Sequence, residues 1–118
     1  MECKAQALRK KFMLKETCIC DIYFEYPVFS DGDKEKKAIN KFYKGFAENA
    51  AEFAKKESES IQNEGFILFL RMHFSVEYVS QTEIKISLFI SRRHGVRTVL
   101  KKSLSQTWDI STQKLIKA

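Results

Sequence analysis

Strict alternation of apolar and polar residues is the feature that most constrains the fold of this chain. Between positions 68 and 108 the alternation occurs in three runs, with short turn-like links between them. Every second residue of a strand lies on the same face, so each run predicts a strand with one apolar face. Short links between consecutive strands favour antiparallel pairing. The predicted strands cover 68–78, 84–90 and 96–108.

Two further elements precede these strands. Residues 17–26 alternate in the same way and stop before Pro27, which cannot donate a hydrogen bond to a neighbouring strand. Residues 34–61 predict an amphipathic helix. The turn 30–33 has two aspartates that suit the helix N-terminus, and Gly65 suits its end. The apolar positions of the helix, spaced by three and four, are Ile39, Phe42, Tyr43, Phe46, Ala50, Phe53 and Ala54.

One amphipathic helix and one half-apolar sheet bury each other's apolar surfaces in two layers. The sequence therefore predicts an α+β fold with one long helix on an antiparallel sheet of about four strands, in the order β-α-β-β-β. The 118 residues include only one Pro and four Gly, which favours a single domain over 1–118. For the basic segment 1–14, helix and flexible chain both remain open.

The net charge of +6 permits contact with nucleic acid, anionic lipid or an anionic wall polymer. No secretory signal is visible, and the longest apolar run, 66–70, is too short to cross a bilayer. As written, the chain is expected to be cytoplasmic. The three cysteines are Cys3, Cys18 and Cys20, and their spacing favours free thiols over a disulfide or a metal site. No cofactor or metal is predicted.

The densest basic cluster lies at the predicted tip of the last hairpin. Loop tips on a rigid sheet often carry function, and arginine side chains suit an anionic ligand. His94 could serve as a neutral ligand or a proton carrier, but catalysis would also need a carboxylate or a thiol beside it. The alternative is a plain turn in which Gly95 supplies a positive φ. The cluster consists of Arg92, Arg93, His94, Gly95 and Arg97.

A family resemblance rests on residues 26–30 and 39–42, on His94 and Gly95, and on Trp108, Asp109, Ile110, Thr112 and Lys114. On these residues the chain is similar to a bacterial domain of unknown function, of the families numbered 4163 and 3298. That domain occurs ahead of the catalytic module of the peptidoglycan deacetylase PdaC and in the extracytoplasmic part of the anti-sigma factor RsiV. The sequence departs from the family pattern at Arg92, Arg93, Thr107 and Gln113, the last of which stands where the family has a turn glycine.

The resemblance implies a noncatalytic binding or sensory module, located outside the membrane if a leader was removed. Its partner would be a protein or an anionic cell-wall ligand. Replacing Arg92 and Arg93 with alanine is expected to weaken binding of that partner and leave the fold intact. A basic nucleic-acid-binding domain and a small hydrolase using His94 remain as alternatives. Nucleic-acid binding would want exposed aromatic rings beside the charge, whereas most aromatic side chains fall on the inferred core face. The candidate binding residues are Arg92, Arg93, His94, Gly95, Arg97, Trp108 and Asp109.

Overall fold

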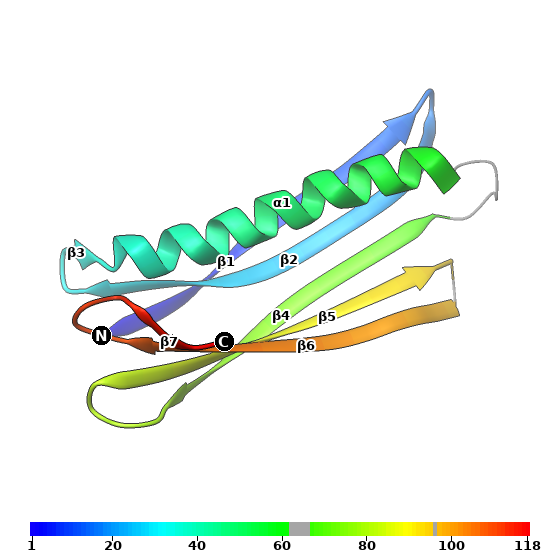
Figure 1. Ribbon diagram of the computed structural model, residues 1–118. Helices are drawn as coiled ribbons and strands as arrows, with labels where there is room; N and C mark the ends of the chain where they lie inside the picture. Colours follow the sequence, from blue (N-terminus) through cyan, green and yellow to red (C-terminus); the bar gives the residue numbers. More distant parts are fainter. Residues whose placement is uncertain (62–66, 96) are drawn as a thin grey trace.

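A computed structural model describes residues 1–61, 67–95 and 97–118 and shows one helix on one face of a seven-stranded mixed sheet (Figure 1). The sheet order is β1-β2-β4-β5-β6-β7, and β3 pairs with the end of β2. The helix α1 spans Lys37–Ile61. The strands are β1 (Glu2–Leu14), β2 (Thr17–Asp31), β3 (Lys34–Glu35), β4 (Leu68–Tyr78), β5 (Glu83–His94), β6 (Arg97–Asp109) and β7 (Leu115–Lys117).

The fold is mostly β, so the predicted α+β sandwich with an antiparallel sheet of four strands is wrong. The antiparallel meander of β4, β5 and β6 is present as predicted. However, β2 and β4 run parallel, because α1 carries the chain back across the sheet between them. The basic segment at the N-terminus forms β1, which pairs with β2 along its whole length. Only Leu8 and Phe12 of this edge strand pack against the core, and its other residues are exposed, so the sequence shows little apolar alternation there.

Strand β2 continues past Pro27 to Asp31, beyond the predicted end of the strand. Its parallel neighbour β4 pairs only with residues 20–24 of β2, so Pro27 has a strand on one side only. A proline is tolerated at a position where its missing N–H faces no ladder. The extension carries β2 under the start of α1, where the backbone N–H of Phe29 donates to Oδ1 of Asn40.

The helix begins three residues later than predicted. Lys34 and Glu35 form β3, which pairs with Asp31 and Ser30, so the aspartate-rich turn closes a hairpin and does not cap the helix. Gly32 adopts the left-handed conformation that such a tight turn needs, with a φ of 62°. The predicted helix stop at Gly65 lies outside the described residues.

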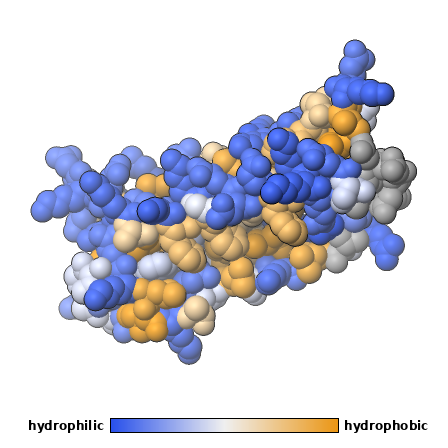
Figure 2. Space-filling model, turned by 45° about the horizontal axis from the view of Figure 1, so that its top comes forward, coloured by the Kyte–Doolittle hydropathy of each residue, from blue (hydrophilic) through white to orange (hydrophobic). Residues whose placement is uncertain are grey.

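The buried stripe of α1 differs from the predicted one. Phe42 and Phe53 were assigned to the core, but Phe53 is 69% exposed and Phe42 packs at the margin of the core. The small alanines instead let the helix lie close to the sheet. Seen from the helix side, hydrophobic atoms form a band beside the hydrophilic surface of α1 (Figure 2). The buried residues of α1 are Ile39, Tyr43, Ala47, Ala51, Ala54 and Ser58.

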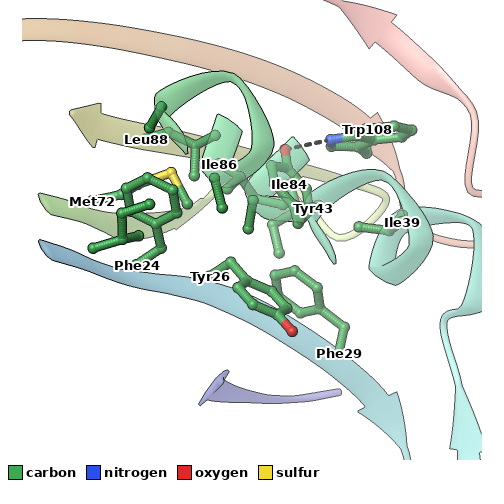
Figure 3. Close-up of a cluster of buried hydrophobic side chains, with 14 of the residues drawn as sticks. Phe24, Tyr26, Phe29, Ile39, Tyr43, Met72, Ile84, Ile86, Leu88 and Trp108 are labelled. Atoms are coloured by element: carbon green, nitrogen blue, oxygen red, sulfur yellow. Dashed lines mark hydrogen bonds between the residues drawn. The ribbon is translucent and has the colours of Figure 1, made fainter. Parts of the chain in front are cut away.

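The core lies between α1 and the facing side chains of β2, β4, β5 and β6 (Figure 3). Tyr43 is fully buried in it and connects the helix to the far strand. Its hydroxyl donates to Oε1 of Gln106 and accepts from Nε1–H of Trp108, both at 2.8 Å. Burial raises the pKa of Tyr43 well above its usual range, so the hydroxyl remains protonated. These two bonds tie α1 to β6.

Candidate binding surface on the open sheet face

The residues singled out from the sequence lie at two opposite ends of the sheet. His94 pairs with Arg97 at one end of the β5–β6 hairpin, and Glu83 pairs with Asp109 at the other. The 13 residues of β6 separate these ends by on the order of 40 Å. Trp108 and Asp109 therefore do not form one site with the arginine cluster.

At the first end, Arg92, Arg93 and His94 belong to β5 and not to the turn. Arg92 forms an ion pair with Glu57 of α1, and its Nη2 donates to Nε2 of His94 at 3.2 Å. Gly95 has a φ of 59°, the positive value predicted for the turn, and its N–H donates to the carbonyl of Ile67. Arg92 and His94 thus connect the strand end to the helix, while Arg93 lies exposed on the other side of the sheet.

Neither Glu83 nor Asp109 can orient the ring of His94, because both carboxylates are at the far end of the hairpin. Within residues 1–61, 67–95 and 97–118, the one side chain hydrogen-bonded to His94 is the guanidinium of Arg92, which cannot accept a proton. The same residues hold no group of three or more potential metal ligands.

The three cysteines are free thiols. Cys20 is buried in the core, Cys18 is half-buried and Cys3 is exposed. Burial raises the pKa of the Cys20 thiol to about 11, so it stays protonated at neutral pH and is a poor nucleophile. Its position under α1 indicates a packing role.

At the second end, Trp108 and Asp109 organise a turn. Trp108 is buried against Tyr43, whereas Asp109 accepts hydrogen bonds from the backbone N–H of Thr112 at 2.8 Å and from the hydroxyl of Ser111 at 3.1 Å. The bond from the Thr112 backbone is the main reason that the pKa of Asp109 lies below its usual value. Both residues serve the fold at this end.

The same turn places Gln113 at the N-terminus of α1. Its Oε1 accepts from the backbone N–H groups of Ala38 and Ile39, at 2.9 and 3.4 Å, and so acts as a cap supplied from a distant part of the chain. Gln113 has a φ of 57°, a conformation that favours glycine. Gln113 therefore supplies two helix-capping bonds while it adopts a backbone conformation for which glycine is suited.

Substitutions at Gln113 are expected to separate these two effects. Gln113→Ala removes the cap but keeps the strained backbone, and should lower the free energy of unfolding by about 1 kcal/mol. Gln113→Gly also removes the cap but relieves the strain, so it should cost less than the alanine variant. Gln113→Glu keeps an acceptor at the positive end of the helix and should preserve stability. Urea unfolding measures all three, and an alanine variant as stable as the parent would contradict the capping role.

The face of the sheet opposite α1 is covered by no element among the described residues. Successive side chains of a strand point to opposite faces, so the residues on this face alternate along each strand with those that pack in the core. Cross-strand neighbours on this side are Phe69 with Arg93, Arg71 with Ser91 and Lys101, and His73 with Phe89 and Ser103. We call this group the basic sheet face; it consists of Phe69, Arg71, His73, Phe89, Ser91, Arg93, Lys101 and Ser103.

Two adjoining hollows open on the basic sheet face. The larger, of about 450 Å³, lies beside the rings of His73 and Phe89, which stack with their centroids 5.0 Å apart. The smaller, of about 150 Å³, lies beside Phe69 and Arg93, whose guanidinium carbon is 4.7 Å from the ring centroid. Ser91 and Lys101 line both hollows, so the two hollows adjoin.

The cations on this face differ in how they are paired. Arg71 forms an ion pair with Asp21 of β2 at 3.1 Å and donates to the Asp21 carbonyl. In the described part of the chain, no carboxylate lies within ion-pair distance of Arg93 or Lys101. Those two charges are exposed and available to an anion.

The sequence contains a signal for this face that lies outside the predicted binding residues. Phe69 and Phe89 occupy the polar positions of alternating strands, where an apolar ring has no core to enter. Arg93 was selected for its place in the hairpin, yet its partners on the sheet are Phe69 and Thr98. Strand register, which the sequence does not state, brings these residues together.

No family model matches the sequence, and no curated protein matches it. Among solved structures, the crystal structure of a member of the DUF3298 family from Bacteroides fragilis is similar, with a TM-score of 0.64 and 12% sequence identity. The match covers 98% of this chain and 58% of that protein, so this chain spans less than two thirds of its length. At this identity the similarity establishes a shared fold. That protein is a member of DUF3298, one of the two families that the sequence resembles.

No helix within the described residues is both long enough and apolar enough to cross a bilayer.

Proposed function

We propose that this chain is a noncatalytic binding module of the DUF3298 type that holds an anionic ligand on its basic sheet face. One observation carries the proposal: Arg93 and Lys101 are exposed, have no ion-pair partner among the described residues and line the same hollow of the sheet. Two like charges held side by side on neighbouring strands attract an anion that can contact both. The proposal concerns charge and shape, so it applies in the cytoplasm and outside the membrane alike.

This proposal moves the binding surface from the hairpin tip to the adjoining sheet. Arg93 is the one residue of the predicted cluster that belongs to both. Arg92 and His94 are engaged with each other and with Glu57, and Trp108 and Asp109 stabilise the far turn. A residue already bonded within the protein has fewer donors to offer to a ligand.

Reversing the two free charges tests the proposal. Arg93→Glu combined with Lys101→Glu should weaken binding of inorganic polyphosphate at low salt by about tenfold or more, because both attractive contacts become repulsive. The matched control is Lys41→Glu combined with Lys44→Glu, which changes net charge equally on exposed positions of α1. Fluorescence competition with a labelled polyphosphate measures both affinities.

Equal losses in the two double variants would show that polyphosphate responds to total charge alone, which would contradict a defined surface. A parent protein that does not bind polyphosphate even at low salt would contradict it as well. Circular dichroism of both variants verifies that the sheet is retained.

A further inference from the structure

The basic sheet face offers aromatic rings as well as charge. His73 on β4 and Phe89 on β5 stack across the two central strands of the sheet, with an angle of 20° between their planes. Four residues further along β5, Arg93 lies over the ring of Phe69 on β4. The spacing between Phe89 and Arg93 along the strand is on the order of 13 Å. The face therefore has two flat stacking surfaces, the His73–Phe89 pair and the Arg93–Phe69 pair, with a gap between them.

Positive and hydrogen-bonding groups lie between the two stacking surfaces. Lys101 and Ser91 line both hollows, and Ser103 borders the larger one. Arg71 also lies over the Phe69 ring, at 5.7 Å, and Asp21 holds its guanidinium in place. A ligand that matches this surface needs flat rings at intervals and negative charge between them.

We propose that the ligand of the basic sheet face is single-stranded nucleic acid. Its bases would stack against the His73–Phe89 pair and on the guanidinium plane of Arg93, and its phosphates would lie beside Lys101. This inference rests on the proposed function, because it names the anionic ligand of the same face. Open sheets that bind single strands use this combination, with aromatic rings on central strands and cations along the path of the backbone.

The arrangement discriminates against two other polyanions. In a duplex the base faces are covered by their neighbours, so rings standing on a sheet cannot stack on them. A polyanion without rings can bind Arg93 and Lys101 but gains nothing from Phe89. Removal of the Phe89 ring should therefore affect single strands alone.

The experiment compares three probes on the full chain: an oligothymidylate of about 15 nucleotides, a duplex of equal length, and inorganic polyphosphate. Phe89→Leu should weaken binding of the single strand roughly tenfold and leave polyphosphate binding unchanged. The matched control is Phe53→Leu, which removes an exposed ring from α1, away from this face, and should change neither affinity.

A second variant reports stacking directly and keeps an aromatic ring at position 89. Phe89→Trp adds a fluorophore on the face, whereas the single native tryptophan, Trp108, is buried on the core side. Stacking of a base should quench the added emission when oligothymidylate binds, and polyphosphate should leave it unchanged. A thermal melt shows that each variant folds.

The outcomes separate this inference from the proposed function. If polyphosphate binds through Arg93 and Lys101 while Phe89→Leu binds the single strand as well as the parent does, the face is a plain anion surface and the inference is wrong. Equal affinity for duplex and single strand would also overturn it. If neither nucleic acid nor polyphosphate binds at low salt, the proposed function fails together with the inference.

Discussion

Tyr43→Phe is expected to lower the free energy of unfolding by about 2 to 4 kcal/mol, although it removes a single oxygen atom. The hydroxyl of Tyr43 both donates to Gln106 and accepts from Trp108, and all three residues are buried. Its removal leaves an indole N–H and an amide oxygen without partners in the protein interior. Each unsatisfied buried group costs about 1 to 3 kcal/mol, which accounts for the size of the effect. Urea unfolding followed by far-ultraviolet circular dichroism measures the change.

Tyr26→Phe is the matched control. Tyr26 is buried in the same core, but across the part of the chain that the structure describes its hydroxyl has no hydrogen-bond partner (Figure 3). Its loss should therefore change stability by less than about 1 kcal/mol. Similar losses for the two tyrosines would show that the effect comes from ring packing, and would contradict the role assigned to the hydrogen bonds.

A second substitution tests which partner carries the cost. In a Gln106→Leu background the amide oxygen is already absent, so Tyr43→Phe leaves only the Trp108 N–H without a hydrogen-bond partner. The penalty of Tyr43→Phe should then be smaller by about 1 kcal/mol or more. A penalty independent of Gln106 would indicate that the Trp108 bond alone matters.

Arg92→Met is expected to be the second most damaging of the proposed changes, at about 2 to 3 kcal/mol. The side chains of Arg92 and Glu57 are 25% and 19% exposed, so removing the arginine leaves a carboxylate largely shielded from water. Fully buried pairs lose about 3 to 5 kcal/mol when one partner is removed, and the residual exposure here lowers the figure. The ion pair joins α1 to the end of β5, so the loss should appear as earlier unfolding of that end in hydrogen exchange.

The adjacent arginine is the control. Arg93→Met changes the same charge one position along the strand, but its side chain is on the open face and should cost about 0.5 kcal/mol or less. Adding Glu57→Leu to Arg92→Met removes the stranded carboxylate and should recover most of the stability. Equal effects of Arg92→Met and Arg93→Met would contradict the internal role of Arg92.

These predictions change what is expected from replacing both arginines with alanine. The sequence suggested that the double variant would keep its fold and lose only binding. Because Arg92 holds α1 to β5, the double variant should also be destabilised, and Arg93 alone is the clean probe of binding. Adjacent residues of a strand point to opposite faces, so two arginines that look equivalent in sequence have different environments.

Much of the fold follows from local patterns. The helix is amphipathic over most of its length, and β4, β5 and β6 alternate regularly, so their presence and their meander were predictable. The edge strand β1 has no clear apolar period because it packs only Leu8 and Phe12 against the core, and the short β7 is exposed throughout. The true start of α1 depends on β3 and Gln113, two contacts from outside the helix. Missing these elements made the fold appear to be a small α+β sandwich.

The candidate site was predictable only in part. Composition identified a basic chain, and the densest cluster of charge lies at the same end of the sheet as the proposed basic sheet face. The cluster itself divides between two faces, with Arg92 directed to Glu57 and Arg93 to Phe69. The aromatic rings that complete the proposed surface come from β4 and β5. They are distant in sequence and become neighbours only through strand pairing, so a local sequence pattern does not reveal them together.

By itself, the sequence determined the alternation, the helix period and the positive charge, because these depend on residues a few positions apart. Only the tertiary structure decided the parallel pairing of β2 with β4, the capping of α1 by Gln113 and the assembly of the basic sheet face. Each of those depends on register between segments distant in the chain. A shift of one residue in pairing moves every side chain of a strand to the other face. Register therefore determines which arginines form ion pairs with the helix and which remain exposed to solvent.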